Sequence, residues 1–233
     1  MTTTAWVRFR HEGREAFGVL RDGHIALHGG DMFAGATATG HNVALADVQL
    51  LMPVRPGKVL ALWNNFGQLA AKLGLAAPAA PVKVIYEGEL GIVIGRRAKA
   101  VSEAQAQEHV FGYTCANDIT AADILHRDAT FPQWVRAKGF DTFCPIGPAV
   151  VQGLDPASLR VVTRLNGAVR QDFPLSDMHF SAAQLVSLIS QDMTLEPGDV
   201  ILCGTSVGVG SMKPGSDVEV EIAGIGTLRN RFE

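Results

Sequence analysis

Two glutamates are the first candidates for chemistry in this sequence. Glu87 and Glu89 lie two residues apart in the run 84–95, whose Ile, Val and Tyr residues favour a β-strand. Side chains two apart on a strand point to the same face, so we expect these carboxylates to lie close together. Carboxylates held that close repel each other unless one is protonated or a cation lies between them. A divalent metal ion is the simplest explanation of the pair.

The alternative is a solvated edge strand that carries two outward glutamates, which is common on protein surfaces. The residues that follow, 90–94, are apolar or glycine, and such a run predicts burial on both faces. Buried carboxylates must be paired or bound to metal. The context therefore favours a metal-binding pair.

A third carboxylate, Asp118, ends the strand-like run 111–118 and precedes a short predicted helix. It could ligate the metal or cap that helix, and Thr120 is a rival cap that would leave Asp118 free. Three oxygen ligands without a Cys/His cluster indicate a hard ion, Mg2+ or else Mn2+ or Ca2+, and not zinc. About three octahedral positions would remain for water and a chelating substrate.

Lys138 lies among apolar and glycine-rich residues in 133–148, a setting that predicts a lysine turned inward toward acids. The alternative is a surface lysine whose stem packs beside Trp134 and Phe140. Cys144 in the same segment could be a nucleophile, but no histidine lies near it in the sequence. We therefore favour a structural thiol at Cys144.

The elements that must position these residues are mostly strands. A meander is expected over 5–28, and the Pro/Gly cluster at 52–57 predicts a boundary between a small N-terminal β domain, 1–55, and the main domain, 56–233. Helices are expected at 102–108 and 181–191, and Asn166-Gly167 predicts a type I′ hairpin turn. The fold class is mainly β with few helices (α+β), not a βαβ array.

One further acidic pattern is interpreted differently. Asp217, Glu219 and Glu221 alternate with Val218, Val220 and Ile222, as on a strand with one buried face. We expect this acidic face to be solvated strand surface and not a second metal site.

Composition limits the other classes of function. The chain has 233 residues, a formal charge of −3 and a pI near 6.2, with Lys and Arg scattered without runs. This charge distribution gives no case for nucleic acid or anionic membrane as partner. The three widely spaced cysteines predict reduced thiols of a cytoplasmic protein. No signal peptide and no membrane-spanning stretch is expected.

Five motifs follow one another along the chain: YEGELGIVIG, GYTCAND, AKGFDTFCPIGP, Asn166-Gly167 and LEPGDVILCGTSVGVG. Together they resemble the fumarylacetoacetate hydrolase family, which includes acylpyruvases, oxaloacetate decarboxylases and the isomerase/decarboxylases of homoprotocatechuate breakdown. The resemblance runs from about residue 58 to the C-terminus. It implies a β-roll or barrel core, a homodimer, and a small oxo-acid substrate.

The same resemblance assigns roles to single residues. It implies that Glu87, Glu89 and Asp118 are the metal ligands and that Lys138 is a catalytic lysine beside the substrate. Thr205 falls where the family's Gly-Thr turn meets the substrate carboxylate, which implies a catalytic and substrate-binding role. Asn65 matches the asparagine of the family's first conserved segment and is a substrate-binding candidate.

The chain departs from the family at its acid–base residues. Many members carry Asn-Tyr-x-x-His-Ala-x-Glu, where His and Glu form a dyad, whereas this chain has Leu69 and Lys72 at those positions. The arginine that commonly follows the metal-binding aspartate is replaced by Ala122. Between Gly74 and Tyr86 a short Ala/Pro linker stands where relatives carry a longer lid, which predicts either a stretch missing from the sequence or a genuine deletion.

Three hypotheses about function follow. The first is a metal-dependent hydrolase that cleaves a C–C bond in an acylpyruvate-like diketo acid through a chelated enolate. The second is an isomerase or decarboxylase of an unsaturated 2-oxo-dicarboxylate, as in aromatic catabolism, or an oxaloacetate decarboxylase. The third is a catalytically silent binding protein that has lost its base.

Overall fold

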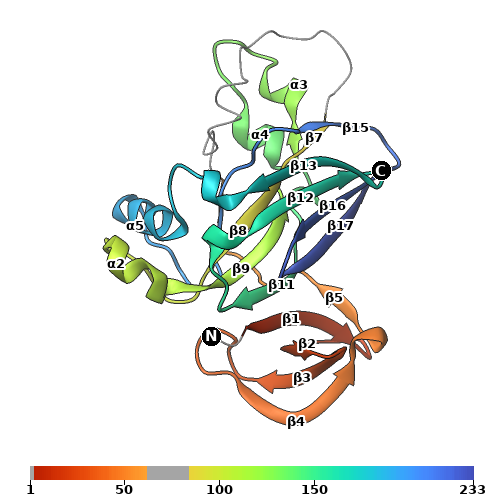
Figure 1. Cartoon of the computed structure of the whole chain (residues 1–233), viewed down its shortest axis with the longest axis vertical. Coiled ribbons are helices and arrows are strands. Elements are labelled where there is room, and N and C mark those ends of the chain that lie inside the picture. The colour runs from red at the N-terminus through yellow and green to blue at the C-terminus, as the bar shows by residue number, and fades with distance from the viewer. Residues whose placement is uncertain (1–2, 62–83) are drawn as a thin grey trace.

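The computed structural model describes residues 3–61 and 84–233, and within these ranges the protein is mainly β with few helices (Figure 1). The predicted fold class is thereby confirmed. The described strands form three sheets, of ten, three and four strands. In the described ranges no helix is both long enough and apolar enough to cross a membrane.

The largest sheet runs through the whole molecule in the order β4-β3-β2-β1-β11-β9-β8-β14-β6, with β5 paired to β1. The strands of this sheet are β1 Thr4–His11, β2 Arg14–Arg21, β3 His24–Gly29, β4 Thr37–Ala44, β5 Gln49–Leu51, β6 Val59–Ala61, β8 Gly88–Ile94, β9 Val110–Asn117, β11 Ile146–Gln152 and β14 Val200–Leu202.

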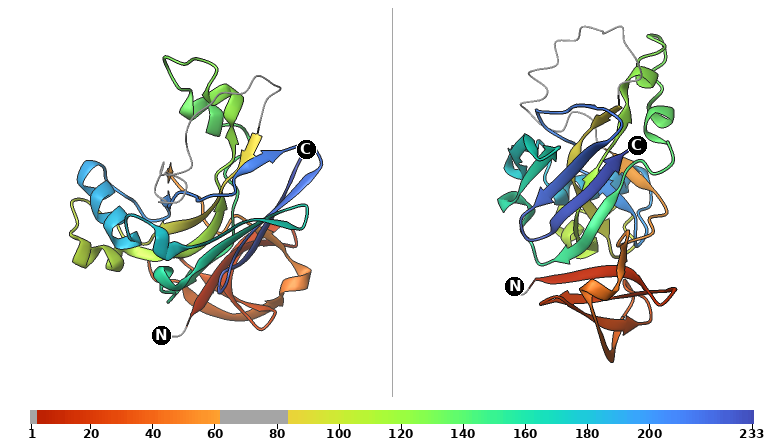
Figure 2. Two further views of the ribbon diagram at one scale, coloured as in Figure 1. Left: turned by 45° about the horizontal axis from the view of Figure 1, so that its top comes forward. Right: turned by 90° about the vertical axis from the view of Figure 1, so that its right-hand side faces the viewer.

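The N-terminal strands form the predicted meander. Their tight turns at Glu12-Gly13 and Asp22-Gly23 have positive φ at both residues, as two-residue hairpins require. The meander lies at the opposite end of the molecule from α3 (Ala122–Leu125) and α4 (Trp134–Lys138) (Figures 1 and 2). β1 pairs with β11, so backbone hydrogen bonds join the meander to the rest of the large sheet. A domain boundary at residue 55 stays a prediction.

Two smaller sheets complete the β structure. The three-stranded sheet has the order β10-β7-β15 (Thr120–Ala121, Val84–Tyr86, Gly210–Met212), and the four-stranded sheet has the order β13-β12-β16-β17 (Ala168–Pro174, Arg160–Leu165, Ser216–Ile222, Gly226–Phe232). The predicted hairpin turn joins β12 to β13, with φ of 51° at Asn166 and 78° at Gly167. Buried side chains of β8, β12, β13 and β16 share one core cluster, so the four-stranded sheet packs on the large sheet.

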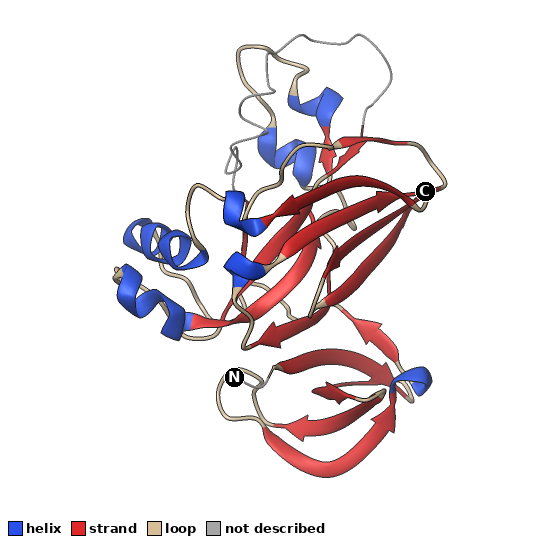
Figure 3. Cartoon of the chain, in the orientation of Figure 1, coloured by secondary structure: helices blue, strands red, loops and turns tan. Residues whose placement is uncertain are grey.

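Helices are few and short (Figure 3). α2 (Glu103–Ala106) and α5 (Ala182–Asp192) confirm the two predicted helices, with capping boxes at Ser102 and Ser181, and they lie side by side (Figures 1 and 2). The single-turn elements are η1 Leu45–Asp47, η2 Gln107–His109, η3 Pro156–Ser158 and η4 Leu175–Asp177.

The prediction of one continuous strand over 84–95 is wrong, because the chain passes from one sheet to another within this segment. β7 ends at Tyr86 in the three-stranded sheet, and β8 begins at Gly88 in the large sheet. Glu87 lies at the junction, where its N–H donates to the side-chain oxygen of Asn117 in place of a backbone carbonyl. Every residue of β8 is buried, which confirms the expectation that this run has no solvated face.

Candidate metal centre and active site

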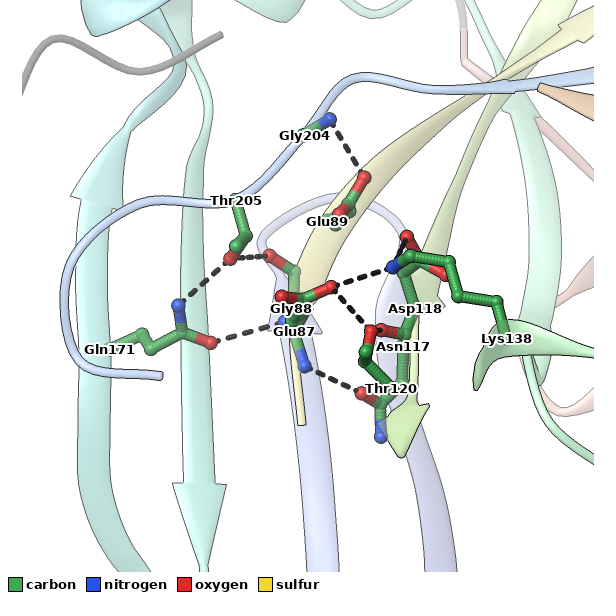
Figure 4. Close-up of polar contacts among 10 residues, drawn as sticks. All are labelled: Glu87, Gly88, Glu89, Asn117, Asp118, Thr120, Lys138, Gln171, Gly204 and Thr205. Carbon is green, nitrogen blue, oxygen red and sulfur yellow. Dashed lines mark hydrogen bonds and ion pairs between the residues drawn. The ribbon is translucent and has the colours of Figure 1, made fainter. Parts of the chain in front are cut away.

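The three predicted ligands converge in space. Glu87, Glu89 and Asp118 each offer a carboxylate oxygen, and these oxygens all lie within 4.8 Å of one another (Figure 4). We call these residues the acidic trio. Glu89 is 1% exposed and the side chain of Glu87 is 13% exposed, so the alternative of a solvated surface pair does not describe these two glutamates. Asp118 is 4% exposed.

Backbone hydrogen bonds hold the two segments of the acidic trio together. Asp118 N–H donates to the carbonyl of Glu87 at 2.9 Å, and Glu87 N–H donates to Asn117 Oδ1 at 3.0 Å. In the β8–β9 ladder Gly88 stands opposite Asn117. A side chain at Gly88 would collide with the hydroxyl of Thr163, so only glycine fits between the two glutamates.

The electrostatics of the acidic trio disfavour three bare carboxylates. Burial raises the pKa of Glu89 well above its ordinary range, and the charges of Asp118 and Glu87 add to that rise. Burial likewise raises the pKa of Glu87 and of Asp118, against the opposing effect of Lys138. A bound cation would relieve this repulsion, and three carboxylate oxygens are the ligands that hard divalent ions prefer. The donor set therefore fits Mg2+, Mn2+ or Ca2+.

Lys138 ends α4 and points inward, as expected. Its Nζ lies 2.9 Å from Glu87 Oε2 and 2.5 Å from Asp118 Oδ2. Burial alone would lower the pKa of Lys138, but the charges of Glu87 and Asp118 outweigh it and raise that pKa. The ammonium group therefore stays protonated at neutral pH and acts as a fixed positive charge beside the acidic trio.

The helix-capping expectations for Thr120 and Asp118 are wrong. A two-residue strand, β10, lies between Asp118 and α3, and the N-cap of α3 is Ala121 without a side-chain cap. The hydroxyl of Thr120 instead donates to Glu87 Oε2 at 3.2 Å. Thr120 thus orients a candidate ligand, and Asp118 is left to face the other two acids.

Thr205 lies in the loop after β14 and is 7% exposed. Its hydroxyl donates to the carbonyl of Gly88 at 2.9 Å and accepts from Gln171 Nε2 at 2.8 Å. The neighbouring Gly204 N–H donates to Glu89 Oε2 at 2.7 Å. The Gly-Thr turn is therefore attached to the acidic trio, and its contact with a substrate carboxylate stays a prediction.

Sequence reasoning missed two of these residues. Gly204 could have been suspected, because it precedes Thr205 in the Gly-Thr motif. Gln171 carries no signal beyond the alternation of β13, which buries Gln171 and Phe173 and exposes Arg170 and Asp172.

Several expectations concern residues that the structure does not describe. Asn65, Leu69 and Lys72 lie in 62–83, outside the described residues, as does most of the linker between Gly74 and Tyr86. The substrate-binding role of Asn65 and the loss of the acid–base dyad stay predictions.

The thiols do not provide a nucleophile at neutral pH. Burial raises the pKa of Cys144 to about 12, and the nearby charges of Asp118 and Glu89 act in the same direction. Burial also raises the pKa of Cys115 to about 12, and that of Cys203 above its ordinary value. Attack requires the thiolate, so a structural interpretation of Cys144 is the better one. None of the three cysteines, all of which lie in the described residues, forms a disulfide, consistent with the predicted reduced thiols.

Comparison with known proteins places the chain among related sequences. The family model described as "Fumarylacetoacetate (FAA) hydrolase C-terminal" matches residues 44–233, and "Rv2993c-like, N-terminal" matches residues 5–53. "Protein Rv2993c" of Mycobacterium tuberculosis is 42% identical over 224 residues, covering 85% of this chain and 83% of that protein. "Oxaloacetate tautomerase FAHD2A, mitochondrial" of Bos taurus is 34% identical over 220 residues, covering 80% and 70%.

Solved structures agree with this placement. A 5-carboxymethyl-2-hydroxymuconate delta-isomerase from Mycobacterium smegmatis superposes with a TM-score of 0.87 at 37% identity, covering 98% of both chains. A maleylpyruvate hydrolase from Sphingobium sp. SYK-6, in complex with manganese(II) and pyruvate, superposes with a TM-score of 0.80 at 26% identity, again covering 98% of both chains.

Proposed function

The chain belongs to the fumarylacetoacetate hydrolase family, and from this premise we propose that it is a metal-dependent enzyme that stabilises the enolate of a 2-oxo acid. The observation that carries the proposal is the acidic trio, with its oxygens within 4.8 Å of one another. Two buried carboxylates and one nearly buried carboxylate, with Lys138 as their contacting cation among the described residues, form a site suited to a divalent ion.

Each described residue has a task in this proposal. Glu87, Glu89 and Asp118 would hold the ion, which would supply a Lewis acid for two chelating substrate oxygens. Lys138 lies beside them and would donate a hydrogen bond to the oxyanion that develops as the enolate forms. Thr205 would contact the substrate carboxylate through its backbone, because its hydroxyl hydrogen is already donated to the carbonyl of Gly88.

Among reactions that share an enolate, we favour keto–enol tautomerisation or isomerisation of a 2-oxo-dicarboxylate. Such reactions need charge stabilisation and a group that carries one proton between carbon and oxygen or between two carbons of the substrate. Hydrolysis needs in addition a base that activates water, worth about 10²–10⁴-fold in rate. Within the part of the chain that the structure describes, the basic group in contact with the acidic trio is Lys138, which forms ion pairs with Glu87 and Asp118. The names of the oxaloacetate tautomerase and of the muconate isomerase support the same choice.

Hydrolysis of a C–C bond in an acylpyruvate-like diketo acid, which the sequence placed first, is the second candidate. It is favoured by one observation, the structural likeness to a maleylpyruvate hydrolase whose solved complex contains manganese and pyruvate. In that reaction the same enolate is the leaving group, so the metal site and Lys138 would serve it equally. Hydrolysis would also require a residue that acts as a base and activates water, in addition to the residues named above.

The test follows the fate of the substrate with Mg2+ or Mn2+ and with EDTA. Oxaloacetate, pyruvate and an acylpyruvate are incubated in D2O and followed by proton NMR. Metal-dependent exchange at C3 or a faster keto–enol equilibration supports tautomerisation, and release of pyruvate with a carboxylic acid supports hydrolysis. Release of pyruvate with CO2 indicates decarboxylation, and metal-dependent binding without turnover indicates a silent binding protein. Turnover that EDTA leaves unchanged would refute the proposal.

A homodimer is part of the same proposal. The motifs of the chain resemble those of a family of dimeric enzymes, and this resemblance is the basis for expecting a homodimer. Light scattering coupled to gel filtration measures the mass in solution, and a monomeric mass across the working concentration range would contradict it.

A further inference from the structure

Gln171 joins the four-stranded sheet to the acidic trio. It lies on β13 and is 1% exposed. Figure 4 shows its side chain between Thr205 and Gly88. Its Nε2 donates to Thr205 Oγ1 at 2.8 Å and to the carbonyl of Ser206 at 3.1 Å, and its Oε1 accepts from Gly88 N–H at 3.1 Å. A side-chain amide offers two N–H donors, so both donors of Gln171 are used.

These contacts close a ring of hydrogen bonds. Gln171 donates to the hydroxyl of Thr205, that hydroxyl donates to the carbonyl of Gly88, and the N–H of Gly88 donates back to Gln171. The ring gives the Thr205 hydroxyl one orientation and fixes both polar groups of Gly88. Hydrogen bonds in such a closed, buried arrangement polarise and strengthen one another.

The ring acts on the metal site because of where Gly88 lies. Gly88 separates Glu87 from Glu89, so the orientation of its two peptide planes sets the directions of both carboxylates. The edge of β8 opposite β9 pairs with β14, and the paired residues of β8 are Gly91, Ile92 and Val93. Gly88 therefore has no pairing residue on β14. Gln171 supplies the acceptor that a strand would otherwise supply.

We propose that Gln171 is a positioning residue that holds the Glu87–Gly88–Glu89 segment and the Thr205 hydroxyl in one fixed arrangement. The inference rests on the proposed function, because it concerns the same metal site. Side chains that support metal ligands from behind typically contribute 10–100-fold to metal affinity or activity. Gln171 would therefore act on metal affinity through Gly88 and on substrate binding through Thr205.

The first test is Gln171→Met, which keeps the length of the side chain and removes its hydrogen bonds. We expect the Mn2+ dissociation constant, measured by calorimetry, to rise about 10-fold or more. Without metal, backbone amide exchange measured by mass spectrometry should accelerate in peptides that contain Gly88 and Thr205. An unchanged exchange rate, or an Mn2+ constant within twofold of wild type, would overturn the proposal.

The second test is Gln171→Glu, which separates the two contacts of the ring. Glutamate keeps an acceptor for Gly88 N–H but replaces the donor to Thr205 and to the carbonyl of Ser206 by a second acceptor. We expect Mn2+ affinity to recover to within threefold of wild type while the KM for the oxo acid stays raised and kcat changes less. Equal losses of affinity in the two variants would contradict the assignment, and this test remains available if the methionine variant does not fold.

Gln152→Met is the matched control. Gln152 accepts a hydrogen bond from Trp6 Nε1 at 3.2 Å at the meander end of the large sheet, so its loss removes a glutamine contact remote from the acidic trio. We expect wild-type Mn2+ affinity and KM in this variant, and a shift in either would overturn the specific role of Gln171. If the proposed function is wrong, the wild-type protein itself should fail to bind Mn2+. The amide-exchange measurement is made without metal, so it tests the hydrogen-bond ring independently of the proposed function.

Discussion

Two acidic patterns of this chain look alike in sequence and differ in structure. On β16 Asp217, Glu219 and Glu221 alternate with buried apolar residues, and around Gly88 two glutamates alternate in the same way. The β16 acids each contact an arginine: Arg231 with Asp217 at 3.3 Å, Arg229 with Glu219 at 3.3 Å, and Arg164 with Glu221 at 2.5 Å. Every one of these acids keeps part of its side chain in solvent, which confirms the predicted strand surface.

The acidic trio has the opposite surroundings. Its members are buried or nearly so, and within the described residues Lys138 is the cation that contacts them. On β16 negative and positive charges are matched in water, whereas the acidic trio is short of positive charge in a low-dielectric setting. In this chain, alternating acids form a candidate metal site where burial and a shortage of cations occur together.

Exchanging one acid in each pattern gives the largest expected contrast. Glu89→Gln should reduce Mn2+ affinity by roughly 100-fold or more and abolish metal-dependent turnover, because a ligand is lost and not merely its support. Glu219→Gln, the matched change on β16, should leave both unchanged. Calorimetric titration with Mn2+ and the oxo-acid assay measure the two effects, and equal behaviour of the two variants would erase the distinction between the patterns.

Removing the cation of each pattern gives the next contrast. Lys138→Met should lower kcat by about 10²–10³-fold, because a preorganised donor to the developing oxyanion is lost. Mn2+ affinity should be kept or increased, since a positive charge beside the ion is removed. Arg229→Met is the control and should leave kcat at the wild-type value. A kcat of Lys138→Met within threefold of wild type would remove Lys138 from the mechanism.

The pH dependence of the acidic trio has a definite sign. Because the pKa of Glu89 is raised above its ordinary value of 4.5, the folded protein binds more protons than the unfolded chain in the window above that value. The contribution of Glu89 to metal-free stability should therefore decrease as pH rises through the window, while Mn2+ affinity should increase as the competing proton leaves.

Thermal unfolding in EDTA and Mn2+ titrations across this pH range test both signs. The metal-free Glu89→Gln variant should not show the pH dependence of stability that Glu89 causes. At neutral pH this variant should be more stable than the metal-free wild-type protein. A wild-type protein whose metal-free stability rises with pH across the window, with no difference from Glu89→Gln, would contradict the burial argument.

The smallest effect is expected on β16. Arg229 is 73% exposed, and its ion pair with Glu219 is of the solvated kind. Arg229→Ala should cost no more than about 1 kcal/mol of unfolding free energy. For a chain of this size that corresponds to at most about 2–4 °C in the melting temperature. Calorimetry at low and high salt measures it, and a larger loss would show that β16 depends on its surface charges.

The sequence was most informative where the signal was local. Alternation placed the β16 acids on a solvated face, serine caps located α2 and α5, and the Asn166-Gly167 turn identified a hairpin. Sequence reasoning was less successful where a residue's partner came from a distant segment. Thr120 was considered as an alternative helix cap, yet its hydroxyl donates a hydrogen bond to Glu87, 33 positions away in the chain.

The sequence by itself determined the mainly β class, the carboxylates and lysine of the candidate site, and the family. These follow from residue types and short spacings, which act through local backbone geometry and charge. Only the tertiary structure decided that the chain changes sheets at Glu87, that Lys138 reaches two of the acids, and that Gln171 supports Gly88 from a position 83 residues away. Contacts of that kind depend on how separate sheets pack against each other, and no periodicity within one segment encodes that packing.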